Sequence, residues 1–373
     1  MANLGPRDTS HLVMLTGWDA TELQNFTLQD GATYAEVVAR MSAALAGLNA
    51  EFAGDWMSSL YSLTDQPDVE YRVGSSNGFE EHTEYGRPDA KRAATEGHML
   101  PLKGWDRMLG WTWDYLRDAR LPQIEADIAD AIKDARDKRR QRILRRLLKA
   151  GDDSGATLNL GTGGYSPGFA HAAASTEVDF TPPTYGGTSF DSDHTHYVGI
   201  TGSAYTNALF TDAKDEIREH GHEPPYSFLA GPSDEATIKA LSNFTPVPEL
   251  LVRYGATQDL ATLGVAEIGT GAYPIGTIND FAVYIVRGMP QYYGFGWKPY
   301  GRLSQRNPLR VRLHKGSSAW QIVAMTDPHS PGRGMYPIER LMLFVEFGVG
   351  VADRTNGTAR YTVSETWADG TAT

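Results

Sequence analysis

Apolar residues recur at helical spacing in two long stretches of the chain. The first stretch is GATYAEVVARMSAALAGLNAEF, where one helical stripe is apolar: Val37, Met41, Ala44, Leu45 and Leu48. Thr33 stands at its start and Glu36 follows three residues later, which is the spacing of a capping box. The pattern predicts a packed helix with Thr33 as its N-terminal cap.

The second stretch, LPQIEADIADAIKDARDKRRQRILRRLLKAG, predicts a longer helix over about residues 121–150. Pro122 suits a first helical turn, and Gly151 is a natural stop. The apolar stripe of this stretch comprises Leu121, Ile124, Ile128, Ala131, Ile132, Ala135, Ile143, Leu144, Leu147 and Leu148. At 1.5 Å per residue, such a helix is about 40–45 Å long, which indicates a spine rather than a local element.

The C-terminal half of this predicted helix is strongly basic. Its seven cations are Lys138, Arg139, Arg140, Arg142, Arg145, Arg146 and Lys149. They could contact DNA phosphates, or they could form a solvated or subunit-facing side with nearby aspartates as partners. We favour the second interpretation, because the cations interleave with apolar core positions. One helix could serve both purposes.

Residues 65–104 lie between the two helices and differ in character. They contain few aliphatic side chains, a charged middle and the turn signal Asn77-Gly78. The flanks VEYRV and HMLPL predict the arms of a long hairpin. A two-stranded arm is only marginally stable alone. We therefore expect this segment either to be disordered or to pack on another molecule.

The second half of the chain alternates between short elements. Loops and short strands are expected over 151–192, followed by a strand in HYVGITGSAY and a helix in NALFTDAKDEIREHG that ends at Gly221. A strand in YSFLAGP precedes a helix in SDEATIKALSNF that Ser233 is expected to cap. Further strands are predicted in GVAEIG, FAVYIVRGM and LRVRLH.

The last part of the sequence, RLMLFVEFGVGVADRTNGTARYTVSE, predicts two strands. Asn356-Gly357 between them is a hairpin signal, so the two strands are expected to pair with each other. The small, polar tail ADGTAT is expected to fray.

Composition excludes several classes of protein. The 373 residues include 34 basic and 46 acidic side chains, for a net charge of -12, whereas a dedicated nucleic-acid binder usually has a basic excess. With no cysteine, neither a disulfide nor a thiolate nucleophile is available. No apolar run approaches 18 residues and the N-terminal residues do not read as a secretory signal, so no membrane partner is expected.

Catalytic motifs are weak. No GxSxG elbow is present, and GTGGYSPG lacks the lysine of a phosphate-binding loop. The sharpest cluster is DSDHTHYVG, from which Asp193, His194 and His196 could serve a metal-dependent enzyme. EHGHE supplies a second His-x-His pair, His220 and His222. We favour polar loop histidines, and we expect no enzyme activity and no cofactor.

The order of predicted elements matters more than any single motif. An N-terminal arm, a polar hairpin, a spine helix, a mixed region and closing strands follow one another. Three stretches sharpen the pattern: EGHMLPLKGWDRMLGWTWDYLRDAR, GTINDFAVYIVRGMPQYYGFGWKPYG and LMLFVEFGVGVADRTNGTARYTV. The chain resembles the Hong Kong 97-like major capsid proteins of tailed bacteriophages, whose fold is of the α+β class.

This resemblance implies a division of the chain into five segments. They are an N-terminal arm and helix (1–64), an extended loop (65–104), a peripheral domain with the spine helix (105–224), an axial domain (225–340), and closing peripheral strands with the tail (341–373). The extended loop would lie across a neighbouring subunit. Its expected contact residues are Tyr71, Phe79, Glu80, Glu81, Arg87, Lys91 and Arg92.

The resemblance also implies the partners. The family assembles as pentamers and hexamers into an icosahedral shell around double-stranded DNA, so we expect a virion protein assembled in the host cytoplasm. A portal protein, a separate scaffolding protein and a decoration protein are the further partners expected, and assembly is expected to be non-covalent. An encapsulin-type nanocompartment shell, which shares the fold, is the nearest alternative; the metal-dependent enzyme is the alternative from another class.

Overall fold

The computed structural model describes residues 27–54, 56–73, 94–112, 115, 118–151, 153–154, 165–166, 168–169, 182–191, 194–247, 272–314, 321–326 and 338–371. The chain divides into two units. The first comprises Met1–Phe52, Gly104–Arg139 and Leu313–Phe347, and the second comprises Ala53–Lys103, Arg140–Arg312 and Gly348–Thr373. The chain passes from one unit to the other within helix α4 (Leu121–Leu148) and within strand β15 (Ile338–Val351).

Helix α2 (Tyr34–Gly54) begins where the sequence predicts. The amide of Glu36 donates to the hydroxyl of Thr33 over 3.3 Å, and the amide of Thr33 donates to the Glu36 carboxylate over 2.9 Å. Each side chain thus satisfies an amide that the first turn of a helix leaves without a partner. The predicted capping box is confirmed.

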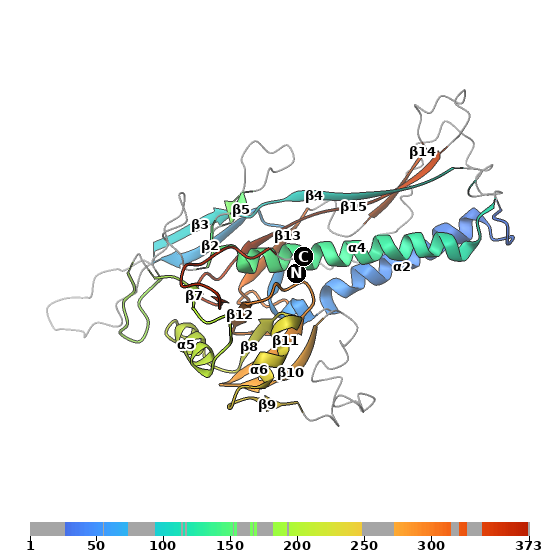
Figure 1. Ribbon diagram of the computed structural model, residues 1–373. Helices are drawn as coiled ribbons and strands as arrows, with labels where there is room; N and C mark the ends of the chain where they lie inside the picture. The colour runs from blue at the N-terminus through green and yellow to red at the C-terminus, as the bar shows by residue number, and fades with distance from the viewer. Residues whose placement is uncertain are drawn as a thin grey trace. The chain divides into compact units, whose positions relative to one another are not determined.

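The core of the first unit lies between α2 and α4, which run side by side in Figure 1. Val37 and Met41 of α2 pack with Ile124 and Ile128 of α4 and with Trp111 of strand β4 (Lys103–Thr112). The four helical side chains among them are ones that the two helical stripes placed on one face. Burying each of them is worth about 1.5–3 kcal/mol, so these stripes are what hold the two helices together.

Polar contacts of the first unit tie α4 to its neighbours. The indole of Trp111 donates to Asp127 over 2.8 Å, and Arg107 of β4 pairs with Asp134. Strand β14 (Gln321–Thr326) pairs antiparallel with β15, and β4 also pairs with β15.

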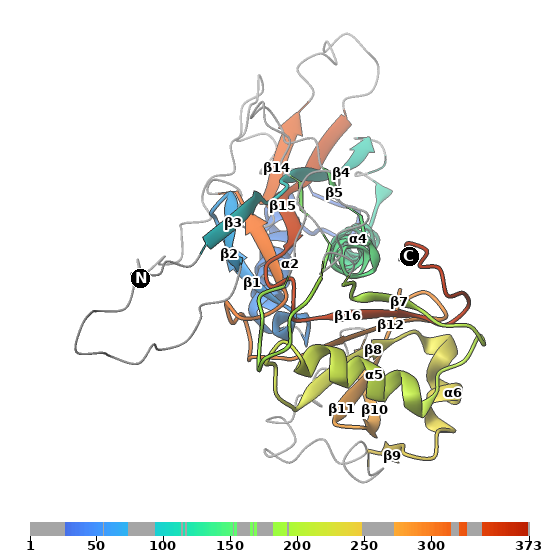
Figure 2. The ribbon, with the colours of Figure 1, turned by 90° about the vertical axis from the view of Figure 1, so that its left-hand side faces the viewer.

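A seven-stranded sheet forms the centre of the second unit (Figure 2). Its order is β7 (Tyr197–Gly199), β16 (Thr358–Tyr361), β12 (Tyr293–Trp297), β8 (Tyr226–Ala230), β11 (Phe281–Val286), β10 (Ala272–Ile278) and β9 (Thr245–Pro246). The β8–β11 and β16–β7 pairs are parallel, whereas the other neighbours are antiparallel. Strands far apart in the sequence thus lie side by side.

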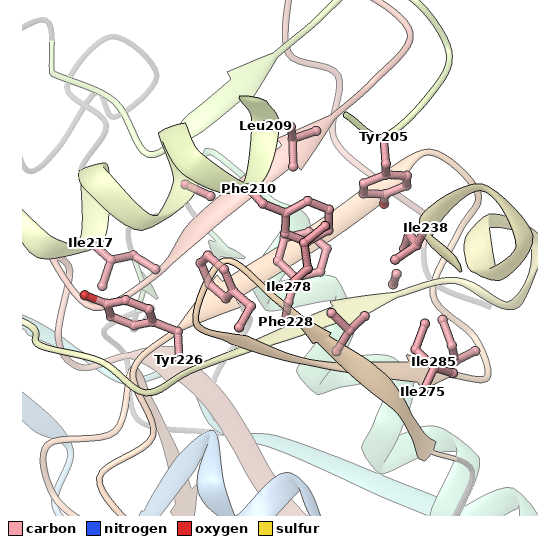
Figure 3. Close-up of a cluster of buried hydrophobic side chains, with 14 residues drawn as sticks. Tyr205, Leu209, Phe210, Ile217, Tyr226, Phe228, Ile238, Ile275, Ile278 and Ile285 are labelled. Atoms are coloured by element: carbon pink, nitrogen blue, oxygen red, sulfur yellow. The ribbon is translucent and has the colours of Figure 1, made fainter. Parts of the chain in front are cut away.

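Helices α5 (Asn207–Arg218) and α6 (Glu235–Lys239) cover one face of this sheet. Figure 3 shows the aromatic side chains of Phe210 on α5 and Phe228 on β8 meeting beneath the helix, with ring centroids 4.8 Å apart. Phe281 of β11 packs on both rings. α5 ends at Arg218, three residues before the predicted stop at Gly221, whose φ of +84° favours glycine.

The predicted hairpin at Asn356-Gly357 is wrong. β15 and β16 lie in different sheets, because β16 pairs with β12 and β7. The Asn356 side chain is buried; it accepts from the amide of Lys298 over 2.8 Å and donates to the carbonyls of Lys298 and Arg306. A Cβ on Gly357 would lie 2.6 Å from the Phe295 ring, so glycine permits a close approach here. This dipeptide makes tertiary contacts instead of forming a two-residue turn between paired strands.

The helix predicted over SDEATIKALSNF is shorter than expected, and Ser233 does not cap it. A 3₁₀ turn, η2 (Pro232–Asp234), precedes α6, and no side chain caps either element. Asp234 instead accepts from the amide of Tyr292 over 2.9 Å. Burial raises the pKa of this carboxyl to about 6, although that hydrogen bond opposes the shift.

The remaining elements are short. A 3₁₀ turn, η1 (Trp56–Ser59), leads into β1 (Tyr61–Thr64), which pairs in parallel with β13 (Leu309–Leu313). β5 (Asp153–Ser154) pairs with β6 (Tyr165–Ser166). The strand predicted in GVAEIG lies outside the described residues. Among the described helices, none combines the length and the apolar character needed to cross a bilayer.

Candidate functional site

The arms of the predicted extended loop form a two-stranded sheet of their own. β2 (Asp68–Val73) pairs antiparallel with β3 (Ala94–Met99), with Tyr71 opposite Glu96. The first arm lies where VEYRV predicts it, whereas the second strand ends at Met99 and overlaps the predicted HMLPL only at His98 and Met99. The turn signal and the other expected contact residues lie outside the described residues: Asn77, Gly78, Phe79, Glu80, Glu81, Arg87, Lys91 and Arg92.

The basic half of α4 is largely turned inward. Arg139, Arg142 and Arg146 are buried, and the ammonium of Lys138 lies 4.3 Å from the centre of the Trp105 ring. Arg140 and Lys149 are partly covered, and Arg140 donates to the carbonyl of Arg287 over 3.5 Å. Arg145 is exposed. Three of the seven cations are thus inaccessible to a phosphate in the subunit as it stands.

Arg146 closes the C-terminal end of α4. Its guanidinium donates to the carbonyl of Lys149 over 2.6 Å and to that of Gly151 over 3.3 Å. From the C-terminal tail, Asp369 accepts from the amide of Ala150 over 3.0 Å, and the amide of Gly370 donates to Leu148 over 3.3 Å. The expectation of a frayed tail is therefore wrong for residues 368–371, which help to satisfy the helix end.

We expect Arg146→Met to lower the free energy of unfolding by about 1–3 kcal/mol. The methionine keeps the apolar stem but removes the guanidinium from the carbonyls of Lys149 and Gly151, and the Lys149 carbonyl keeps only the hydroxyl of Tyr197, 3.0 Å away. Arg145→Met is the matched control, because this neighbour is exposed, and it should change stability by less than about 0.5 kcal/mol. Urea unfolding of the soluble subunit measures both variants. Equal losses in the two variants would contradict the capping role of Arg146.

Three histidines converge near the edge of the seven-stranded sheet. His194 and His196 precede β7, and His220 follows α5. The Nε2 atom of His194 lies 3.0 Å from the Nε2 atoms of both His196 and His220, and the latter two are 2.9 Å apart. The Nδ1 atom of His196 lies 2.6 Å from the carbonyl oxygen of Gly357, just before β16. All three side chains are mostly or fully buried.

Burial lowers the pKa of each of these imidazoles. The pKa of His196 lies well below the ordinary value, and that of His220 falls to about 2, with neighbouring imidazoles adding to the effect of burial. The pKa of His194 is also lowered by burial, against the raising influence of Glu216 and Asp191. Burial raises the pKa of the nearby Glu219 carboxyl. The three imidazoles are therefore neutral at pH 7, with lone pairs available.

The cluster differs from the one that the sequence singled out. Asp193 lies outside the described residues, and His222, the partner of His220 in EHGHE, faces a different group of residues. The ring of His222 lies 2.7 Å from the hydroxyl of Tyr300 and 3.1 Å from that of Thr355. The cluster thus contains both histidines of the first His-x-His pair and one histidine of the second.

A buried ion pair lies beside the histidines. Arg360 of β16 donates to Glu216 of α5 over 2.6 Å, and both side chains are nearly inaccessible. The hydroxyl of Thr358 donates to the same carboxylate oxygen. This pair links α5 to the sheet, and the sequence carried no signal for it because the two residues are 144 positions apart.

Comparison with solved structures gives a match over almost the whole chain. A chain from Mycobacterium phage Patience superposes with a TM-score of 0.62 at 18% identity, covering 93% of this chain and 96% of that one. The chain has the Hong Kong 97-like fold. The α+β fold class that the order of elements predicted is thus confirmed, although no family model and no curated protein matches the sequence.

Two further solved structures match at lower similarity. The asymmetric unit of the bacteriophage PhiM1 mature capsid gives a TM-score of 0.47 at 10% identity, covering 83% of this chain and 87% of that one. The capsid of an empty GTA particle gives a TM-score of 0.49 at 13% identity, and the match covers 84% of this chain and 90% of that one.

Proposed function

We propose that this chain is the major capsid protein of a tailed bacteriophage. It assembles as pentamers and hexamers into an icosahedral shell that encloses double-stranded DNA. It resides in the virion after assembly in the host cytoplasm, and it does not act as an enzyme. The observation that carries this proposal is the shared fold with the chain from Mycobacterium phage Patience over nearly the full length of both chains.

The two-stranded sheet of β2 and β3 supports assembly between copies. A two-stranded sheet is marginal by itself and gains stability when it packs on something else. We propose that this arm lies across a neighbouring subunit, with Tyr71 on β2 and the loop residues from Phe79 to Arg92 at the contact. The division into an N-terminal segment, an extended loop, and peripheral and axial domains belongs to the same proposal.

Shell stability then arises from many modest contacts. A typical protein interface buries about 1,600 Å², and a subunit crossed by its neighbours' arms takes part in several. Closed symmetry lets such interfaces add up without an open end. DNA contact is expected to be local and non-specific, because the chain is acidic and Arg145 is the cation of the basic group that is well exposed.

Expression of the untagged chain, alone and with its genomic neighbours, tests this proposal. Negative-stain electron microscopy and sedimentation velocity should show closed shells or free pentamers and hexamers. A chain that stays monomeric at high concentration under all these conditions would contradict the proposal. Closed shells found around a cargo enzyme rather than DNA would favour an encapsulin-type compartment instead. Adjacent portal and scaffolding genes would support the phage assignment.

A further inference from the structure

We propose that His194, His196 and His220 bind one zinc ion, which has a structural role in the subunit. The cluster combines three mostly or fully buried imidazoles whose Nε2 atoms lie 2.9–3.0 Å from one another. This inference concerns the folded subunit alone and does not depend on the proposed function.

Hydrogen bonding among the three rings cannot account for their arrangement. The carbonyl of Gly357 can only accept, so the Nδ1 atom of His196 carries a proton and its Nε2 atom is a bare lone pair in the neutral ring. If His194 and His220 both carry protons on Nε2, those two N–H groups face each other over 3.0 Å. If either lacks that proton, two lone pairs face each other instead. Every neutral arrangement therefore contains at least one repulsive contact.

A divalent cation removes this conflict. It accepts all three lone pairs at once, and neutral imidazole nitrogen is a preferred zinc ligand. Zinc–nitrogen bonds of about 2.0–2.1 Å at tetrahedral angles place ligand nitrogens about 3.3 Å apart. The observed nitrogen separations need to widen by only a few tenths of an ångström to meet this geometry.

The surroundings of the cluster resemble those of metal sites in two respects. The hydrogen bond from His196 to Gly357 fixes the tautomer that leaves Nε2 free, which is how the ring orientation of a ligand histidine is usually set. The ring of Phe190 packs against those of His194 and His220, with centroids 4.9 and 4.3 Å apart. An apolar wall of this kind limits the access of water to the ligands.

Glu219 is placed to supply a fourth ligand. One carboxylate oxygen lies 3.5 Å from the Nε2 atom of His194 and 3.8 Å from that of His220. Glu219 is not among the residues whose ligand atoms all lie within 4.8 Å of one another, so its side chain has to rotate to bring this oxygen to the fourth tetrahedral position. Three histidines and one carboxylate complete four-coordinate zinc, which is the closed form of a structural site. Such a site would connect the C-terminal end of α5 to the sheet edge at β7 and β16.

Metal analysis of the untagged, full-length subunit tests this inference. After incubation with zinc and removal of the excess, we expect about one zinc ion per chain. Chelation should remove the ion and lower the midpoint of thermal unfolding, and added zinc should restore that midpoint in a concentration-dependent way. Cobalt(II) bound in place of zinc should show the ligand-field absorption of a four-coordinate site.

Variants assign the ligands. His194→Gln and His220→Gln should each reduce bound zinc to background and abolish the zinc-dependent shift of the unfolding midpoint. His222→Gln is the matched control, because this buried histidine faces Tyr300 and Thr355, and it should retain the wild-type zinc content. If either ligand variant fails to fold, calorimetric titration of the chelated wild-type chain with zinc remains decisive. Absence of saturable one-to-one binding there, or unchanged zinc content in both ligand variants, would overturn the proposal.

Discussion

A chain that lacks residues 75–92 is expected to remain folded and to form no shells. The deletion removes the segment beyond the paired arms and leaves β2 and β3 in place, so the described cores of both units keep their contacts. A short turn can rejoin the two arms, since Val73 and Ala94 lie opposite each other at the end of the ladder. The deletion should therefore weaken only the contacts between copies of the chain.

Circular dichroism and thermal unfolding report whether the shortened chain folds, and electron microscopy with sedimentation velocity reports assembly. We expect wild-type helix content and unfolding midpoint, together with monomers or free capsomers only. Normal shells would refute the assignment of this segment as an arm between subunits. If the deletion prevents folding, a full-length variant with Phe79→Ala, Arg87→Ala and Lys91→Ala keeps the backbone and tests the same contacts.

Arg360→Met is expected to lower the free energy of unfolding by about 3–5 kcal/mol. The guanidinium lies 2.6 Å from Glu216, and the side chains of Arg360 and Glu216 are 2% and 12% exposed. Removing the cation leaves a carboxylate without a counter-charge in a site that water hardly reaches. The loss comes mainly from this uncompensated charge rather than from the missing attraction. Denaturant unfolding of the soluble subunit measures it.

A double variant separates these two contributions. In Arg360→Met with Glu216→Gln, no charge is buried and the amide oxygen still accepts from Thr358, so most of the lost stability should return. The exposed pair between Lys239 and Glu235, 2.5 Å apart and four residues apart on α6, is the matched control. Lys239→Met should cost about 0.3–0.5 kcal/mol. A similarly small cost for Arg360→Met would contradict the argument from burial.

Local sequence signals predicted the start of α2 and the extent of α4. The Thr33–Glu36 box joins residues within one turn of each other, so it forms whatever the rest of the chain does. The apolar positions of α4 recur at helical spacing along the sequence. The order of these elements was enough to indicate the Hong Kong 97-like fold, because that family is recognised by its arrangement.

Turn signals at strand ends predicted strand pairing less reliably, because the tertiary fold determines which strands become neighbours. Asn356-Gly357 has the sequence of a tight turn, yet the buried amide of Asn356 bonds to Lys298 and Arg306, some 50 residues away. The tail was expected to fray because it is small and polar, but Asp369 and Gly370 satisfy backbone groups at the end of α4. In both cases the observed conformation depends on contacts with residues that are distant in the sequence.

The histidines show the same contrast between what the local sequence determines and what the tertiary structure determines. The sequence by itself determined that two His-x-His pairs flank α5, and that the side chains could bind a metal. Only the tertiary structure decided that His220 joins His194 and His196 while His222 turns to Tyr300. Periodicity and capping act over a few residues and are written in the local sequence, whereas the meeting of side chains 24 or more positions apart depends on how helix and sheet pack.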